Sequence, residues 1–248
     1  MHELTKGLAS NDSLWAILYC VEQALIVCLC TVTVMWLFGG GAAQALKSLG
    51  LGGGIVRGLL LGIVATLPMP VLFALSGHAK FTAGTAVQVG VFGVISGVGE
   101  EVLFRGFAFG LLYRRLRLGF WLSIILPTAA FAVGHLYQVR GLRDSLSILA
   151  LTGFGSVWFG WLYVRWEYNL WVPIAVHALM DSWWSIFSVS ETALGGHEAN
   201  NARLLTVVLS IILTLWHCGW DWRKAFLRIR PPDPESTPSP QFFAKSLR

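Results

Sequence analysis

The sequence predicts an all-α fold, a polytopic transmembrane bundle of seven or eight helices. Hydrophobic residues make up 55% of the 248 residues and charged residues only 12%, whereas soluble proteins carry about 25% charged residues. The apolar residues form continuous runs of about 20 residues, as membrane-spanning helices require, without the alternation typical of a β-barrel. The seven predicted spans are 14–38, 58–77, 85–113, 118–137, 145–164, 169–189 and 204–220. An eighth helix results if the span 145–164 breaks at Gly153 or Gly155.

Basic residues lie at the ends of these runs and give the chain a formal net charge of +5. This placement is typical of helices anchored and oriented in a membrane, and it argues against a nucleic-acid partner. With the N-terminus outside, the inner loops receive Lys47, Arg57, Arg114, Arg115, Arg117, Arg165 and the basic tail. The outer side receives Lys6, Lys80, Arg140, Arg143 and Arg203. The excess on the inner side predicts a cytoplasmic C-terminus.

The composition changes at about residue 221. Residues 1–220 form the predicted integral membrane domain, and its polar motifs fall within about 90–185. Residues 221–248 are basic and rich in proline, as in the segment Pro231-Pro232-Asp233-Pro234. Such a composition is typical of a disordered segment, so we expect a solvated cytoplasmic tail.

The third span carries three charged residues, and each ionisable group inside a membrane costs about 2.5–3.5 kcal/mol on insertion scales. Glu101 and Arg105 are four residues apart on one helix face, with the acid first, which favours an ion pair. Glu100 points to a different side of the helix and is poorly placed to share Arg105. We therefore expect Glu101 to be neutralised structurally and Glu100 to be available for chemistry.

Two other spans carry polar side chains at one-turn spacing. Phe131 and His135 share one helix face, and so do His177 and Asp181. Each of these features alone also fits a structural role: the ion pair as a staple, a histidine as a core residue, or His177 and Asp181 as mutual partners. Glycines at four-residue spacing let helices approach closely, so three helices can converge on one polar pocket. These glycines are Gly93 and Gly97, then Gly106 and Gly110.

Other polar residues lack such a matching set. Glu22 and Gln23 lie near the start of the first span, and we expect them to be interfacial or packing residues. The paired histidines, four apart on one helix with a glutamate, that mark soluble zinc proteases are not found in the sequence.

The charged motifs resemble those of the CPBP family, which comprises CAAX proteases and bacteriocin-processing enzymes and includes the type II CAAX prenyl endopeptidases. The family pattern is Glu-Glu-x-x-x-Arg, then Phe-x-x-x-His, then His-x-x-x-Asn/Asp. The three motifs read here Glu100-Glu101-Val102-Leu103-Phe104-Arg105, Phe131 to His135, and His177 to Asp181. They occur in the family's order and cover about residues 90–185.

The resemblance implies a glutamate-dependent intramembrane peptidase. Glu100 would be the general base that takes a proton from the attacking water, and His135 would hold or activate that water. His177 would donate a hydrogen bond to the developing oxyanion, a contribution of about 3 kcal/mol for one donor. Asp181 would support His177 or the oxyanion site.

The resemblance gives three further residues a supporting role. Glu101 with Arg105 would fix the helix and the orientation of Glu100, and Phe131 is the aromatic residue of the second motif.

Asp181 stands where many relatives have asparagine, and an ionised aspartate cannot donate a hydrogen bond. Asp181 is therefore protonated, orients His177, or helps to bind a metal. Glu100, His135, His177 and Asp181 would make an oxygen and nitrogen site for a divalent metal such as zinc. The family chemistry also works without a metal, so the sequence leaves the cofactor open.

The predicted spans also pose a problem of depth. His135 lies near the outer end of the fourth span and His177 near the inner end of the sixth, more than about 10 Å apart at 1.5 Å per residue. One site forms only if a boundary shifts or a helix is broken or tilted.

The expected substrate is a membrane-associated or lipidated protein or peptide, cleaved in the lipid bilayer. The small size and short loops favour a bacterial plasma membrane protein. Two other functions remain open: a proton-coupled transporter that uses Glu100, His135 and His177 as a relay, and a non-catalytic membrane scaffold.

Overall fold

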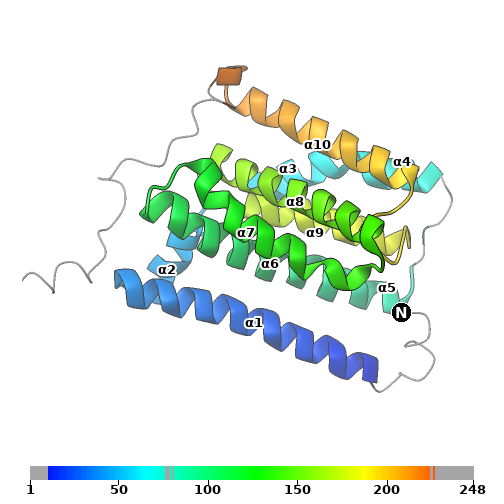
Figure 1. Ribbon diagram of the computed structural model, residues 1–248, viewed down its shortest axis with the longest axis horizontal. Coiled ribbons are helices and arrows are strands. Elements are labelled where there is room, and N and C mark those ends of the chain that lie inside the picture. Colours follow the sequence, from blue (N-terminus) through cyan, green and yellow to red (C-terminus); the bar gives the residue numbers. More distant parts are fainter. Residues whose placement is uncertain (1–10, 76–78, 80, 224–225, 227–248) are drawn as a thin grey trace, which may run out of the picture.

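The computed structural model describes residues 11–75, 79, 81–223 and 226, and all regular structure in this part of the chain is helical (Figure 1). The all-α prediction is confirmed. The α-helices are α1 (Asn11–Phe38), α2 (Ala42–Leu49), α3 (Ile55–Thr66), α4 (Pro68–Leu75), α5 (Ala83–Val87), α6 (Ser96–Glu101), α7 (Phe120–Gly134), α8 (Leu142–Arg165), α9 (Trp171–Ile186) and α10 (His197–His217). Apart from residues 221–223 and 226, the predicted tail lies outside the described residues.

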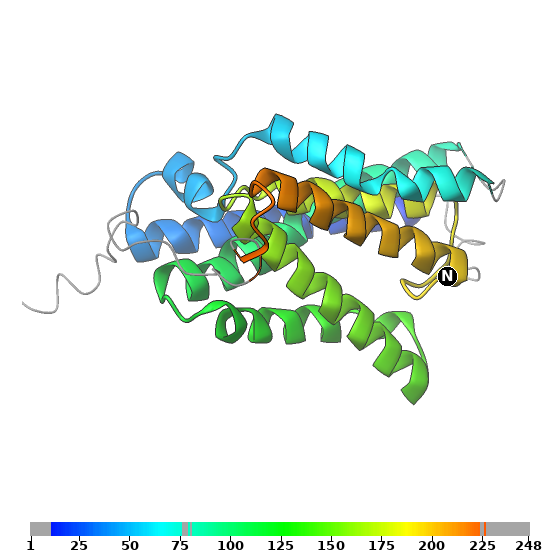
Figure 2. The same cartoon turned by 90° about the horizontal axis from the view of Figure 1, so that it is seen from above.

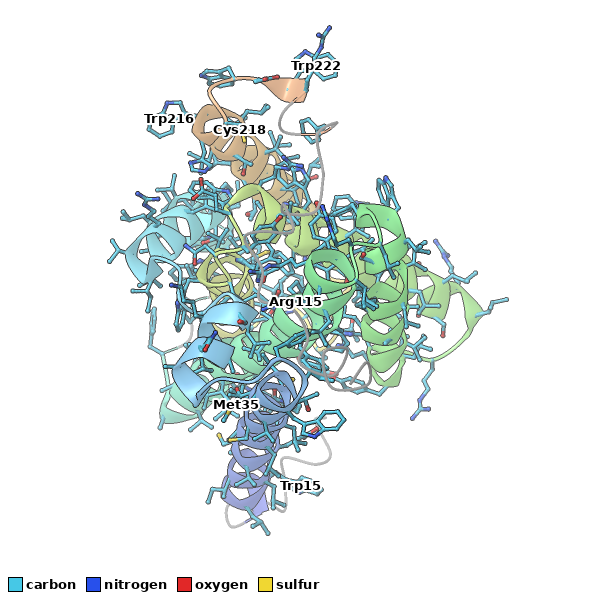
Figure 3. The ribbon with its side chains drawn as sticks, turned by 90° about the vertical axis from the view of Figure 1, so that its left-hand side faces the viewer. Trp15, Met35, Arg115, Trp216, Cys218 and Trp222 are labelled. Atoms are coloured by element: carbon cyan, nitrogen blue, oxygen red, sulfur yellow. The ribbon has the colours of Figure 1, made fainter. Side chains whose placement is uncertain are left out.

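Within the described part of the chain, six helical segments are long and apolar enough to cross a membrane, and they correspond to six of the seven predicted spans. They are Leu14–Phe38, Ile55–Leu75, Ala83–Arg115, Phe120–Gln138, Leu142–Arg165 and His197–His217. Many of their large apolar side chains are exposed, as lipid-facing residues are. Figure 3 shows Trp15 of α1 and Trp216 of α10 pointing away from the bundle at opposite extremes. The protein is thus an integral membrane protein.

The predicted seventh span, 169–189, is the shorter helix α9 of 16 residues. Half of α9 is buried, including the consecutive residues Val172 to Ala178. In Figures 1 and 2 it runs through the middle of the bundle, with α1 and α10 on opposite sides in Figure 1. Because protein rather than lipid surrounds it, α9 need not match the thickness of the bilayer. The segment 142–165 is one continuous helix, so no break occurs at its glycines.

Glycines allow two neighbouring segments to touch the backbone of α9. A Cβ atom on Gly62 of α3 would lie 2.7 Å from the Cβ of Ala175, closer than side chains pack. Gly93 and Gly97 meet α9 at Ser182 and Ala178, where an added Cβ would come within 2.6 and 3.2 Å. The predicted close approach at the 93/97 pair is therefore confirmed.

The third membrane-crossing segment is one helix of changing width. Short α-helical turns, α5 and α6, alternate with the wider π-helical stretches Gln88–Ile95, Val102–Phe109 and Leu111–Arg115. Glu100 and Glu101 end α6, between two of these stretches. π-Helical turns often occur at functional sites, and here they flank the pair of glutamates.

Candidate active site

The site is built around the carboxylate of Glu101, which accepts two hydrogen bonds on one oxygen. Arg105 Nη1 donates to Glu101 Oε1 at 2.9 Å, and His177 Nδ1 lies 2.8 Å from the same oxygen. The side chains of Glu101 and Arg105 are fully buried. The predicted ion pair is therefore present, and it also fixes the imidazole of a second helix, α9, which the sequence did not predict.

Arg105 lies between two aromatic rings. Its guanidinium carbon is 4.6 Å from the ring centre of Phe131 on α7 and 5.2 Å from that of Phe159 on α8. Both contacts fall in the range of cation–π attraction. Arg105 Nε and Nη2 have no hydrogen-bond partner among the described residues. The positive charge of Arg105 is therefore stabilised by Glu101 and by the two rings.

His177 is held in one orientation by three neighbours. Its ring stacks on Phe159 at 5.2 Å between centroids, and Nδ1 faces Glu101. Nε2 lies 3.3 Å from Asp181 Oδ2 and 3.9 Å from Glu100 Oε2. A carboxylate only accepts hydrogen bonds, so Nδ1 donates its proton to Glu101. The contact between Nε2 and Asp181 is then attractive only if a second proton lies on one of these two groups.

Glu100 has a different environment from its neighbour. Ser96 Oγ donates to Glu100 Oε1 at 2.8 Å. The other oxygen, Oε2, is buried and has no hydrogen-bond partner among the residues that the structure describes. The Glu100 side chain is 23% exposed, while that of Glu101 is 0% exposed. The adjacent glutamates thus differ in burial and in partners: Glu101 is enclosed and its Oε1 accepts from Arg105 and His177, while Glu100 is partly exposed. Each also has an Oε2 without a hydrogen-bond partner among the described residues.

His135 lies at the edge of this cluster. Its ring is 4.5 Å from that of Phe131, which is in turn 6.5 Å from His177. His135 Nδ1 pairs with the backbone oxygen of Phe131 at 2.8 Å. Within the described chain, no hydrogen bond or ion pair joins it to Glu100, His177 or Asp181. The Phe131 ring therefore lies between the two histidines, which the predicted spans placed at different depths in the membrane. The proposed role of His135 in holding or activating water stays a prediction.

The predicted metal ligands do not form a metal site in this arrangement. Among the described residues, no three His, Cys, Asp or Glu side chains are placed to hold a metal ion. One ring nitrogen of each histidine is already engaged, His135 Nδ1 by the Phe131 carbonyl and His177 Nδ1 by Glu101. Metal-bound histidines commonly donate their other ring N–H to a carboxylate or a carbonyl, so these two hydrogen bonds do not decide the question, and the metal stays a prediction.

Three residues of the site were not predicted. Phe159 contacts both Arg105 and His177, and Ser96 and Tyr19 extend a hydrogen-bond chain from Glu100. Ser96 precedes Glu100 by four residues, a spacing that could have revealed it. Tyr19 is 77 residues from Ser96 in the chain, and no local pattern connects them.

The fold and this site define the class: a helical membrane protein with a buried cluster of carboxylates, histidine and arginine. Residues 82–183 match the family model described as Type II CAAX prenyl endopeptidase Rce1-like. This match confirms the resemblance to the CPBP family of CAAX-type intramembrane proteases, and it covers the part of the chain that holds all three motifs. No curated protein and no solved structure matches the chain significantly.

The contrast between the two glutamates predicts different effects on stability. Replacing Glu101 by glutamine removes the charge that balances the buried Arg105, and losing one partner of a buried pair costs about 3–5 kcal/mol. We expect Glu101→Gln to melt at a clearly lower temperature in detergent than the wild type. The variant Glu100→Gln changes the neighbouring, partly exposed residue, and we expect its melting temperature to be close to that of the wild type. Equal melting temperatures for both variants would contradict the structural role of Glu101.

Proposed function

We propose that this protein is an intramembrane endopeptidase that hydrolyses a peptide bond in a membrane-associated protein or peptide, with Glu100 as the general base. The observation that carries the proposal is the position of Glu100 Oε2: the side chain is partly exposed, and this oxygen has no hydrogen-bond partner among the described residues and lies 3.9 Å from His177 Nε2, within the region matched by the protease family. This separation is too long for a direct hydrogen bond but can be bridged by one water molecule.

In the first step Glu100 takes a proton from that water while the water oxygen attacks the scissile carbonyl carbon. The carbonyl double bond becomes a single bond, and its oxygen gains the negative charge. His177 donates from Nε2 to this oxygen when that nitrogen carries a proton. Glu101 prepares His177 for this task because it holds Nδ1 and sets the direction of the ring.

In the second step the protonated Glu100 returns its proton to the nitrogen of the scissile bond. The bond between carbon and nitrogen breaks, which releases an amine and a carboxylic acid and restores the Glu100 carboxylate. Asp181, 3.3 Å from His177 Nε2, shares a proton with the imidazole and supports its donor role. His135 donates from Nδ1 to the Phe131 carbonyl, so Nε2 is left as an acceptor that can hold water.

The substrate class follows from the membrane setting and from the family description. A membrane-associated or lipidated peptide would reach the site from the bilayer, and a prenylated peptide is the first candidate because the matching family is named for it. Lipid tails are compatible with the apolar side chains exposed on the membrane-crossing helices.

The proposal is tested by incubating purified wild type and Glu100→Gln with membrane-associated peptides, including a prenylated one, and detecting products by mass spectrometry. We expect the wild type to cleave and the variant to lose about 100-fold to 10,000-fold of the rate, the range for loss of a general base. A parallel incubation with a metal chelator should leave the wild-type rate unchanged.

Equal cleavage by both proteins would exclude Glu100 as the base, and chelator-sensitive cleavage would require a metal ion in the reaction. Ion-coupled flux in vesicles without cleavage would favour a transporter. A function that survives Glu100→Gln without any cleavage would favour a scaffold.

We further propose that the protein lies in a bacterial plasma membrane with its C-terminus in the cytoplasm. Basic residues at the ends of three helical segments support this orientation: Lys47, Arg114 with Arg115, and Arg165. Arg114 joins these ends because it donates to the backbone oxygen of Ser48 and to the Tyr163 hydroxyl. Figure 3 shows Arg115 near the middle of this end of the bundle.

Reporter fusions at the C-terminus test the orientation. A fluorescent protein that folds only in the cytoplasm should be bright there, and alkaline phosphatase, which is active only outside the cytoplasm, should be silent. The reverse pattern would mean that the basic end faces outward.

A further inference from the structure

Helix α1 reaches the reactive carboxylate although it lies outside the matched residues 82–183. The Tyr19 hydroxyl donates to Ser96 Oγ at 2.9 Å, and Ser96 Oγ donates to Glu100 Oε1 at 2.8 Å. The direction of this chain is fixed at its end, because the Glu100 carboxylate can only accept. The Ser96 proton therefore goes to Glu100, and the Ser96 oxygen is free to accept the proton of Tyr19.

The packing of α1 places Tyr19 firmly at this turn. Gln23, one turn after Tyr19, is buried against Gly99, where an added Cβ would lie within 3.2 Å of three Gln23 side-chain atoms. The Tyr19 ring packs on Phe92 with 5.2 Å between centroids. Figure 1 shows α1 running along one side of the bundle beside α6. The contact at Gly99, next to Glu100, leaves little room for α1 to slide.

We propose that Tyr19 and Ser96 form a positioning relay that holds Glu100 in its reactive orientation, an inference that rests on the proposed peptidase function. Ser96 fixes Oε1, so the carboxyl group cannot rotate freely and Oε2 stays directed at His177 Nε2. Tyr19 fixes the Ser96 hydroxyl in turn, because it donates to the lone pairs of Ser96 and so favours the rotamer that points at Glu100.

The relay acts on Glu100 rather than on the substrate. Neither hydroxyl is bonded to His177 or Asp181, within the chain that the structure describes, and Ser96 is buried. Thr31, further along α1, shows the contrasting arrangement: its hydroxyl donates to the backbone oxygen of Val27 in its own helix. Tyr19 instead directs its donor to another helix, next to the group proposed as the base.

The test compares kinetics of Tyr19→Phe, Ser96→Ala and the double variant in full-length protein, with the prenylated peptide that the wild type cleaves. We expect kcat to fall about tenfold or more in Ser96→Ala and by a smaller factor in Tyr19→Phe, with KM within about twofold of the wild type. Because Tyr19 acts through Ser96, adding Tyr19→Phe to Ser96→Ala should cause no further loss.

Matched controls separate the relay from a general effect on packing. Tyr113→Phe changes a buried tyrosine among Phe109 and Phe120, and Ser123→Ala changes a buried serine that donates to backbone oxygens near its own helix start. Both should keep the wild-type kcat. Melting temperatures in detergent are measured for every variant, and Ser96→Thr, which retains a hydroxyl, should recover kcat relative to Ser96→Ala.

Three outcomes would overturn the relay. Wild-type kcat in folded Tyr19→Phe and Ser96→Ala, while Glu100→Gln is inactive, would leave the peptidase standing and remove the relay alone. Independent, additive losses in the double variant would show that Tyr19 does not act through Ser96. Absence of cleavage by the wild type would remove the peptidase function, and the relay falls with it.

Discussion

The double hydrogen bond on Glu101 Oε1 is the interaction on which the site depends. It joins Arg105, one turn along the same helix, to His177 on the central helix α9. A fully buried arginine without a counter-charge would be strongly destabilising, and Glu101 supplies that charge. The same oxygen fixes the His177 ring so that Nε2 points towards Glu100 and Asp181. One atom, Glu101 Oε1, thus both balances the charge of Arg105 and orients His177 for the proposed chemistry.

The scaffold brings these groups together through close helix contacts. α9 is short and buried, and Gly62, Gly93 and Gly97 let its neighbours approach its backbone. The polar side chains that converge there are enclosed by Phe131 and Phe159, which contact Arg105 and His177. Aromatic walls keep the region apolar and strengthen the electrostatic interactions inside it.

The sequence was most informative where partners lie one helical turn apart. The helical class, the Glu101–Arg105 pair and the different environments of Glu100 and Glu101 followed from composition and from four-residue spacing. Contacts between distant segments were not visible in this way. His177 bonds Glu101 across 76 residues, and Tyr19 reaches Ser96 across 77.

The sequence also left the depth of each residue undetermined. The predicted span 169–189 contains α9, which is shorter than the six segments that are long enough to cross a membrane and is enclosed within the bundle. The Phe131 ring therefore lies between the rings of His135 and His177. Helix burial depends on all the neighbours of a segment, and a hydrophobic run by itself does not reveal whether protein or lipid surrounds it.

The division of roles between the adjacent glutamates is tested most directly by the cleavage rate per folded molecule in Glu100→Gln and Glu101→Gln. The glutamine oxygen at position 101 can still accept from His177, so we expect folded Glu101→Gln to retain a reduced but measurable rate. Folded Glu100→Gln has no base and should fall at least about 100-fold below the wild type. Cleavage by Glu100→Gln together with an inactive, folded Glu101→Gln would reverse the roles of the two glutamates and contradict the proposed mechanism.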